Sequence, residues 1–370
     1  MAESVTYKVL GLMSGSSLDG LDLAFCEFQL ENDEITNWQL LAGETLSFTE
    51  QWQNRLRHLP EQSAYTFAQT DTYFGLYMGE LVKQFLIKHQ LRPDFISSHG
   101  HTVFHHPERR FTTQIGSGAA LAGFTGYPVV SDFRSQDVAQ GGEGAPIAPI
   151  ADKLLFSGYD FYLNLGGIAN ISANIGEKQV AFDIGGANQI LNMLAMEAGL
   201  EYDRNGQIAA NGELNLALKQ TVDNLPYFNS PYPKTLDNRW VMAHIAPPYQ
   251  NTEIPLKDRL FTACIQLAEQ INLSIQQILT KENLQADSYQ MLVTGGGAFN
   301  AFLMQTIQNA CPAVEIVIPD ENLIAFKEAI LMALMGLLRV TNQNNCLRTV
   351  TGAKRDTVSG AIYQGWKRTI

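Results

Sequence analysis

The chain has 370 residues, of which 45% are hydrophobic and 17% are charged, a balance typical of globular proteins with a sizeable core. At roughly 150 residues a domain, this length predicts two to three domains. The formal net charge of −12 and the absence of a Lys/Arg-rich run disfavour binding to nucleic acid or to an anionic membrane surface.

The four cysteines are widely separated along the chain, at Cys26, Cys264, Cys311 and Cys346, and form no CxxC pair. This spacing indicates neither a disulfide framework nor a zinc site, and it favours a reducing compartment. The N-terminal segment has no basic stretch ahead of a long apolar core, and the longest apolar run, 329–338, is about half of a ~20-residue membrane span. We therefore expect a soluble, cytoplasmic protein.

The first part of the chain predicts three consecutive strands followed by alternating helices and strands. Strands are expected where β-branched and aromatic residues gather between turn residues, and helices where apolar residues recur at i, i+3 and i+4. This order is typical of a mixed sheet that is antiparallel at first and parallel later. The predicted strands are 5–13, 22–30, 37–48, 95–98, 113–116 and 128–133, and the predicted helices are 51–59, 63–90 and 119–125.

The same order recurs in the second part of the chain, which predicts two similar α/β halves that meet across a cleft. A Gly- and Pro-rich segment at 141–149 lies between the halves, so we place the domains at 1–140 and 141–370. The segment of about 350–370 is the candidate for packing back onto the first domain. The predicted strands are two within 160–174, then 179–184, 289–293 and 314–319, and the predicted helices are 188–198, 262–279, 300–310 and 323–340.

Four glycine-rich loops at predicted strand ends are the candidates for phosphate binding, since glycine lets backbone N–H groups approach an anion closely. They are 11–22, 164–170, 182–188 and 294–300. The first loop alone is equally well explained as an ordinary Ser/Gly turn. Four such loops, together with Asp19, Asp22 and Asp183, favour a nucleotide triphosphate held with Mg²⁺.

Other polar segments have a structural and a functional interpretation. Arg134 is flanked by acidic residues, which fits a structural ion pair, or recognition of an anionic or hydroxylated substrate. The histidines at 99–106 favour hydrogen bonding over metal binding, because no paired cysteine or helical HxxxH accompanies them. Glu328 opens an apolar helix, where an acid is often a partner of the helix dipole. The Pro-rich segment 225–237 is most simply a connection.

In this order, the motifs resemble the signature segments of the anhydro-N-acetylmuramic acid kinase family, in the actin-like superfamily of sugar kinases, Hsp70 and actin. The matching segments cover nearly the whole chain and are GLMSGSSLDGLD, SSHGHTVFH, SDFRSQDVAQGGEGAP, NLGGIANI, FDIGGAN, DRNGQIAANG, TGGGAFN, KEAILMAL and TGAKR. The resemblance implies an α/β fold of two RNase H-like (actin-like ATPase) domains, with mixed sheets flanked by helices and ATP in the interdomain cleft.

The resemblance also implies a reaction, cofactors and partners. The enzyme would hydrolyse the 1,6-anhydro ring of anhydro-N-acetylmuramic acid and phosphorylate O6, using ATP and Mg²⁺. The product would be N-acetylmuramic acid 6-phosphate, in peptidoglycan recycling and amino sugar catabolism. A homodimer is implied as well.

Positions that match the family's motifs give the candidate site. Asp183 is the expected general base and Glu328 the residue that orients the attacking water. Asp19 is the expected metal ligand, directly or through water. The expected substrate-binding residues are His99, His101, Arg134 and Glu143. The expected ATP-binding residues are Gly15, Ser16, Ser17, Leu18, Asp19, Gly20, Leu21, Asp22, Gly166, Gly167, Gly295, Gly296, Gly297 and Asn300.

Some positions depart from the commonest family pattern, and three alternatives stay open. Ser16 replaces a Thr, His101 and Glu143 each replace a Gln, and Ile184 and Gly186 stand where Thr and Pro are usual. An ordinary actin-like sugar kinase would not need the second carboxylate at Glu328. A sugar sensor of the repressor type would carry a DNA-binding helix pair and a Cys-rich loop. A plain glycosidase using the two carboxylates would leave the phosphate-type loops unexplained.

Overall fold

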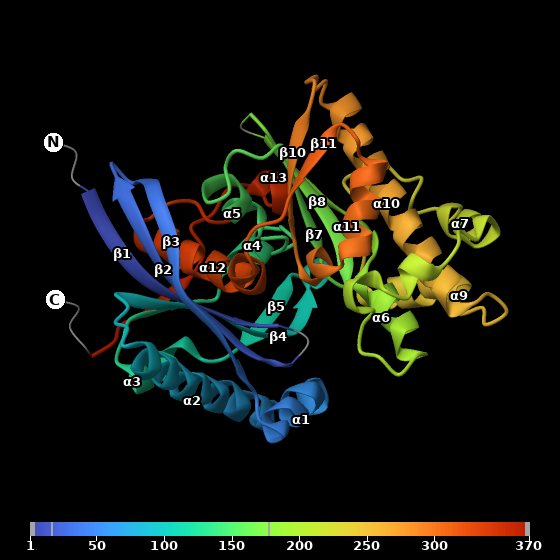
Figure 1. Cartoon of the computed structure of the whole chain (residues 1–370). Coiled ribbons are helices and arrows are strands. Elements are labelled where there is room, and N and C mark those ends of the chain that lie inside the picture. Colours follow the sequence, from blue (N-terminus) through green and yellow to red (C-terminus); the bar gives the residue numbers. More distant parts are fainter. Residues whose placement is uncertain (1–3, 16–17, 177, 367–370) are drawn as a thin grey trace. The chain divides into compact units, whose positions relative to one another are not determined.

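The computed structural model (Figure 1) describes residues 4–15, 18–176 and 178–366. The chain divides into two compact units, which we call unit 1 (Met1–Phe156 with Phe326–Ile370) and unit 2 (Ser157–Ala325). The first segment of unit 1 ends at Phe156 and not at the predicted 140. The C-terminal segment returns to unit 1 as expected, but from Phe326 and not from about 350, because a late helix packs closely on the first strand. A Cβ on Gly11 would collide with the carbonyl oxygen of Ala329, so only glycine allows this approach.

Unit 1 contains a mixed sheet in the order β12-β6-β4-β1-β2-β3, with β5 paired to β4. The first three strands are antiparallel, and β4 and β6 continue the sheet in parallel, as predicted. Two short elements, β5 and β12, pair antiparallel with their neighbours. The strands are β1 (Ser4–Ser14), β2 (Gly20–Glu31), β3 (Glu34–Ser47), β4 (Phe95–His106), β5 (Phe111–Ile115), β6 (Val129–Ser131) and β12 (Ala361–Tyr363).

Helix α2 covers part of this sheet and begins and ends at recognisable signals. Ser63 caps its start by accepting the N–H of Thr66, and Gln90 ends it in the left-handed conformation at φ 55°. Phe74 and Phe85 of α2 are fully buried in the same hydrophobic core as Leu12 and Phe25 of the sheet. The helices of unit 1 are α1 (Glu50–His58), α2 (Ala64–His89), α3 (Gly118–Thr125), α4 (Ser135–Ala139), α5 (Pro149–Leu154), α12 (Glu321–Val340, which begins in unit 2) and α13 (Arg348–Thr351).

The sheet of unit 2 has the order β11-β10-β7-β8-β9. Its first three strands are antiparallel, and β10 and β11 run parallel to β7. This is the same order and direction as β6-β4-β1-β2-β3 in unit 1, which confirms the predicted repeat of architecture. Each unit therefore has the sheet order expected for an RNase H-like domain. The strands are β7 (Phe161–Leu165), β8 (Ile168–Ile175), β9 (Lys178–Gly186), β10 (Tyr289–Thr294) and β11 (Val314–Val317).

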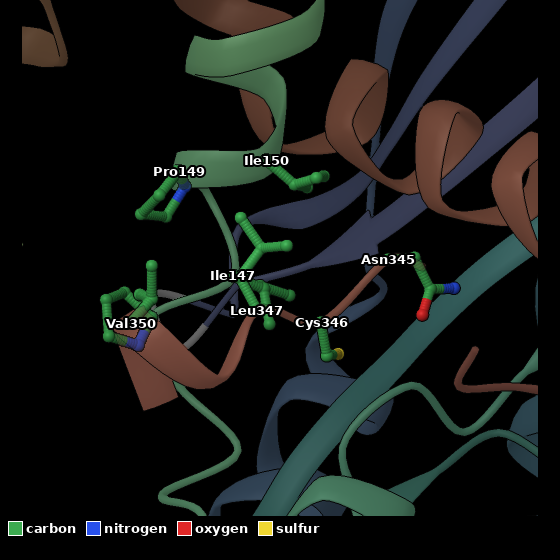
Figure 2. Close-up of a pocket in the computed structure, with 8 residues that line it drawn as sticks. Ile147, Pro149, Ile150, Asn345, Cys346, Leu347 and Val350 are labelled. Atoms are coloured by element: carbon green, nitrogen blue, oxygen red, sulfur yellow. The ribbon is translucent and has the colours of Figure 1, made fainter. Parts of the chain in front are cut away.

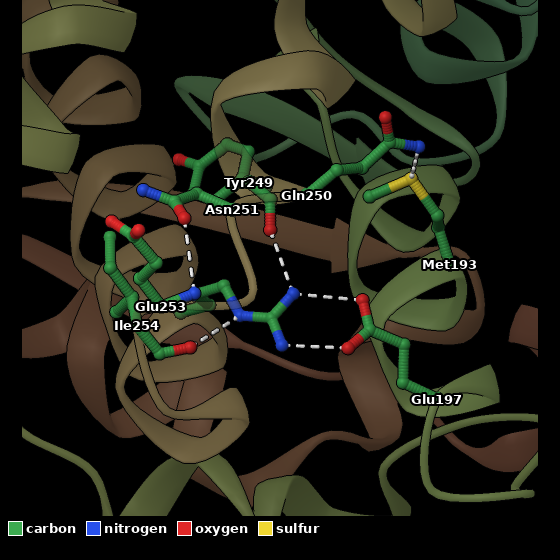
Figure 3. A network of polar contacts seen from close by, with 8 residues as sticks. Met193, Glu197, Tyr249, Gln250, Asn251, Glu253 and Ile254 are labelled. Carbon is green, nitrogen blue, oxygen red and sulfur yellow. Dashed lines mark hydrogen bonds and ion pairs between the residues drawn. The ribbon is translucent and has the colours of Figure 1, made fainter.

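The helices of unit 2 flank this sheet, and α10 is the longest of those in the described residues. It begins at Leu256, before the predicted start at 262. Arg259, only 3% exposed, pairs with Glu197 and donates to the carbonyls of Tyr249 and Ile254, which are labelled in Figure 3. The helices are α6 (Asn188–Met196), α7 (Leu216–Asp223), α8 (Asn238–Trp240), α9 (Ala246–Tyr249), α10 (Leu256–Lys281) and α11 (Ala301–Ala310). None of the helices within the described ranges has the length and apolar character needed to span a membrane.

Candidate active site

Asp183 lies near the end of β9, where the strand departs from regular pairing. Asp183 pairs with Asn170 of β8 and Gly185 pairs with Ala169, so Ile184 is the extra residue of a β-bulge. Bulges change the direction of neighbouring side chains and are frequent beside active sites. Ile184 stands where the family usually has Thr. Its side chain is fully buried and belongs to the hydrophobic core of unit 2.

The segment after α7 holds one carboxylate oxygen of Asp183. Oδ2 accepts a hydrogen bond of 2.9 Å from the Thr235 hydroxyl and one of 2.8 Å from the Leu236 backbone N–H. The Asp183 N–H donates to the carbonyl of Lys234 at 3.1 Å, and the Tyr227 hydroxyl donates to the Asp183 carbonyl at 2.7 Å. Within the described residues no hydrogen bond reaches Oδ1, so this oxygen is the one open to a proton.

The environment of Asp183 makes it a better base than an ordinary aspartate. Burial raises its pKa, while the hydrogen bonds from Leu236 and Thr235 oppose that effect by stabilising the charged form. The net rise increases the basicity of the carboxylate, and a more basic group takes a proton more readily in a transition state.

The Pro-rich segment 225–237, which the sequence predicts to be a simple connection, is in fact the support of Asp183. The signal that marks it is its aromatic content. The ring of Tyr232 stacks on Phe182, beside Asp183, with 4.8 Å between centroids. Thr235 and Tyr227 were therefore missed as site residues, since no motif indicates contacts with a strand about fifty residues away.

In unit 1, Glu328 lies on α12 with charged neighbours of both signs. Its pKa is raised by desolvation and by the carboxylate of Asp22, and it is lowered by Arg134 and Lys327. Glu328 remains partly accessible to water, so solvent screens its interactions with Asp22, Arg134 and Lys327. The raised pKa makes Glu328 suited to exchanging protons with a bound water.

Arg134 and His99 form a pair in unit 1 that fixes the protonation state of the imidazole. Arg134 Nε donates to His99 Nε2 at 2.8 Å, so His99 carries its proton on Nδ1, which lies 3.1 Å from the Gly100 carbonyl. Burial and the arginine charge lower the pKa of His99 to about 3. Arg134 Nη1 donates to the Gly144 carbonyl at 2.9 Å. The other guanidinium hydrogens have no hydrogen-bond partner in the described part of the chain.

The loop between β1 and β2 carries several expected ATP-binding residues, and Ser16 and Ser17 lie outside the described residues. Asp19 is exposed, whereas Asp22 accepts a hydrogen bond of 2.6 Å from Thr45. Burial and the charge of Asp19 raise the pKa of Asp22. The buried side chains of Leu18 and Leu21 belong to the core of unit 1, which leaves only their backbone for a ligand.

The remaining expected substrate residues of unit 1 have different surroundings. His101 is buried, and its Nδ1 lies 3.1 Å from the hydroxyl of Ser14 at the end of β1. Burial lowers the pKa of His101, so its imidazole is neutral at physiological pH. Glu143 has an exposed side chain, and its backbone N–H donates to the Thr351 carbonyl at 2.8 Å.

In unit 2, the glycine-rich loop after β10 lines a cavity of about 630 Å³, within the range of small-molecule sites. Gly295 takes φ +84°, and a Cβ there would press on Leu165. The other wall comes from α6, α10 and the 203–205 turn. The lining residues are Asn188, Leu191, Asn192, Tyr202, Asp203, Arg204, Asn205, Leu260, Cys264, Gly296, Gly297, Phe299, Asn300 and Glu321.

Gly166 and Gly167, expected to bind ATP, use their carbonyls within the protein. Their carbonyls accept the backbone N–H groups of Ala187, Asn188 and Gln189, at 2.9 to 3.2 Å, and so cap the start of α6. The helix therefore has no free first-turn N–H at these three positions. Any phosphate contact at this turn must come from the N–H groups of the glycines themselves.

The described residues offer a cavity for a nucleoside and a single exposed carboxylate for a magnesium ion. The 630 Å³ cavity has the size and the mixed polar and apolar lining that a nucleoside needs. No group of three or more His, Cys, Asp or Glu suited to a metal occurs in the described ranges. Magnesium with ATP needs only one or two carboxylates besides phosphate and water, and the exposed Asp19 fits that need.

The site residues thus fall into two sets. Asp183 with its supporting segment and the Gly295–Gly297 cavity belong to unit 2, while Asp19, Asp22, His99, Arg134 and Glu328 belong to unit 1. Two units of equal sheet order, each carrying polar loops at strand ends, define an α/β protein built from two similar mixed sheets flanked by helices.

Comparison with known proteins gives the family. The model of the anhydro-N-acetylmuramic acid kinase family matches residues 7–365. Curated proteins of that name from a Sulfurovum species and from Haemophilus influenzae are each 32% identical to this chain; the aligned regions cover 96% of the chain and 99% and 97% of the relatives. The chain belongs to the anhydro-N-acetylmuramic acid kinase family, and it is an enzyme.

Among solved structures, similarity extends to two dehydratase activators. The activator of 2-hydroxyisocaproyl-CoA dehydratase from Clostridium difficile, with bound ADPNP, is 12% identical with a TM-score of 0.42, covering 90% of this chain and 97% of that one. Component A of the Acidaminococcus fermentans (R)-2-hydroxyglutaryl-CoA dehydratase is 10% identical with a TM-score of 0.45, covering 90% and 99%.

Proposed function

We propose that this kinase uses ATP, with Mg²⁺, to open the 1,6-anhydro ring of anhydro-N-acetylmuramic acid with water and to phosphorylate O6. The product is N-acetylmuramic acid 6-phosphate, which places the enzyme in peptidoglycan recycling. Membership in the family supports the substrate. The observation that carries the chemistry is Asp183, whose Oδ2 is held by two donors while Oδ1 has no hydrogen bond in the described residues.

The atoms balance in the following way. Water gives one proton to Asp183 Oδ1 as its oxygen bonds to the anomeric carbon C1, and the bond between C1 and O6 breaks. O6 stays on C6 and bonds to the γ-phosphorus as ADP leaves. Glu328 orients the water, and the proton on Asp183 passes to solvent after the reaction. Magnesium, when bound, neutralises charge on the phosphates, and Asp19 is the residue we assign to hold it.

The remaining residues bind and orient the two substrates. The cavity beside Gly296 and Gly297 is the site we assign to the nucleoside, and the backbone near Gly15 and Gly20 is the segment we assign to the phosphates. Arg134 offers its unused N–H groups to oxygen atoms of the sugar, and its charge is fixed in place by His99 and the Gly144 carbonyl. The neutral His99 is an acceptor at all physiological pH values, since its pKa is about 3.

We also propose a homodimer that works in the cytoplasm. The four cysteines are free and buried, which suits a reducing compartment. Support for the dimer is the family resemblance, and sedimentation equilibrium measures it directly. A monomer at micromolar concentration would contradict this part of the proposal without touching the reaction.

The experiment is mass spectrometry of products formed from ATP, Mg²⁺ and the anhydro sugar in oxygen-18 water. We expect a sugar phosphate that carries one heavy oxygen. In Asp183→Asn, turnover should fall by about 10²–10⁴, the usual contribution of a general base. A phosphorylated sugar without the label would identify an ordinary sugar kinase. Asn has the same shape as Asp, so the variant should melt at the wild-type temperature. An unchanged melt then shows that the loss of turnover comes from the missing base and not from unfolding.

A further inference from the structure

Asp137 is a buried carboxylate that the proposed reaction does not use. It lies in α4, is 0% exposed, and forms no ion pair with lysine or arginine among the described residues. Its oxygens are held by neutral donors: Oδ1 accepts the Thr351 hydroxyl and Oδ2 accepts the Gly144 N–H, both at 2.8 Å. An ionised carboxylate needs such donors when it leaves water, so both bonds are strongly favoured.

These bonds join two segments that lie far apart in the sequence. Thr351 ends α13, and besides its hydroxyl it uses its backbone carbonyl, which accepts the Glu143 N–H at 2.8 Å. A little further on, Arg355 Nε donates to Gln140 Oε1 at 3.1 Å. The loop 140–145 is therefore fastened to the C-terminal segment 351–355 by two direct hydrogen bonds and by a third link that passes through Asp137.

The conformation of loop 140–145 explains its glycines. A Cβ on Gly142 would collide with Asp137 Oδ2, and Gly144 takes φ +64°, which glycine adopts without strain. Just beyond the loop, Ile147, Pro149 and Ile150 pack on Cys346, Leu347 and Val350 (Figure 2). They enclose only about 10 Å³, room for a single water, so the packing here is tight.

The same loop continues to the arginine that we assign to the sugar. Gly144 donates its N–H to Asp137 and accepts from Arg134 Nη1 through its carbonyl at 2.9 Å. The backbone N–H and the carbonyl of Gly144 are thus both hydrogen-bonded. A shift of Gly144 therefore moves the guanidinium of Arg134 as well. Thr351, Asp137, Gly144 and Arg134 form one continuous chain of hydrogen bonds within unit 1.

We propose that Asp137 and Thr351 are positioning residues for sugar recognition: they fix loop 140–145 so that the Gly144 carbonyl holds Arg134 in place. The inference rests on the proposed role of Arg134 in sugar binding. It assigns a function to the closing TGAKR motif, whose first residue is Thr351 and whose last is Arg355. Neither positioning residue touches substrate.

The test compares Thr351→Val, which keeps the shape and loses the donor, with Thr351→Ser, which keeps the hydroxyl. We expect the KM for the sugar to rise about tenfold in Thr351→Val, the effect of one lost buried hydrogen bond, with the KM for ATP within about twofold of wild type. Thr351→Ser should restore wild-type values within about twofold. An unchanged sugar KM in Thr351→Val would overturn the proposal.

Thr125→Val is the matched control. The Thr125 hydroxyl is equally buried and donates to the Leu121 carbonyl within α3, away from loop 140–145. We expect no change in either KM. An equal rise in the sugar KM would show that any lost hydroxyl in unit 1 has this effect, and it would overturn the assignment.

Amide hydrogen exchange keeps the test independent of activity and of folding of the variants. In the wild-type protein the N–H groups of Glu143 and Gly144 should be protected, and in Thr351→Val their exchange should speed up while that of α2 stays the same. If the wild-type protein does not turn over the anhydro sugar, the proposed function fails. The exchange rates of the Glu143 and Gly144 amides still show whether Thr351 holds loop 140–145 in place. Fast exchange of both amides in wild type would overturn it.

Discussion

At the scale of single residues, Thr235 tunes the base. Its hydroxyl stabilises the charged form of Asp183 and so lowers a pKa that burial raises. Removing the hydroxyl in Thr235→Val therefore raises the pKa of Asp183. Since kcat/KM requires the free base, its acidic limb moves to higher pH. We also expect kcat on the plateau to fall about tenfold, because one of two bonds that orient the carboxylate is lost.

The measurement is a pH profile of kcat/KM for wild type, Thr235→Val and Thr235→Ser. The serine variant keeps the donor and should keep the wild-type limb. Identical limbs in wild type and Thr235→Val would contradict the role of Thr235, even if the plateau were lower.

Residues of the site were predictable from sequence only where a motif contains them. Asp183, Arg134 and Glu328 stand in motifs, and their candidate status comes from residue type and position. Thr235 and Asp137 were not predicted, because their role is a contact 52 and 214 residues away along the chain. Gly166 and Gly167 match a motif, but their carbonyls are occupied by the start of α6.

At the scale of elements, the start of α10 depends on one ion pair (Figure 3). The Arg259 guanidinium donates to both oxygens of Glu197 at 2.8 and 2.6 Å, and also to the carbonyls of Tyr249 and Ile254. This fork joins α6, α9 and α10. Lysine has no planar fork and cannot reach all four acceptors at once.

We therefore expect Arg259→Lys to lower the free energy of unfolding by about 2–3 kcal/mol, somewhat less than for a fully buried pair because Glu197 is partly exposed. Leu260 and Cys264 follow on the same helix and line the cavity, so ADP affinity should fall as well. Urea unfolding and calorimetry measure the two effects.

Arg57→Lys, at an exposed arginine of α1, is the control and should change stability by less than about 0.5 kcal/mol. Equal effects in the two variants would contradict the role of the fork.

The long elements were predictable, and so were some short strands such as β6 and β11, but other short elements were not. Helix α2 and the strands β1 and β2 follow from periodicity and composition, because each buries a set of apolar side chains. The short elements α4, α5, α13 and β12 have three to six residues, and tertiary contacts create them. Strand β12 exists because Ala361–Tyr363 pairs with β6, which no local signal indicates.

At the scale of the whole molecule, the repeated order of strands was predictable, while the course of the chain between units was not. The chain leaves unit 1 after Phe156 and returns at Phe326, in the second turn of α12. The sequence predicts that the apolar run 329–338 belongs to a helix of the second domain. It belongs to unit 1, because Gly11 of β1 and Ser97 of β4 lie against its backbone at Ala329 and Gly336.

This course makes unit 2 a single continuous segment, whereas unit 1 needs two. A polypeptide of residues 157–325 contains a complete sheet core and every residue that lines the 630 Å³ cavity. We expect it to unfold cooperatively and to bind ADP, within about tenfold of the affinity of the whole protein, since the proposed nucleoside contacts are all present.

Residues 1–156 alone lack the α12 residues that cover Gly11 and Ser97, and they should not unfold cooperatively. Adding 326–370 as a separate peptide should restore a cooperative melt of 1–156, because it supplies the missing side of the core. Circular dichroism melts and titration calorimetry with ADP measure these outcomes. A folded 157–325 segment that fails to bind ADP would place the nucleoside elsewhere.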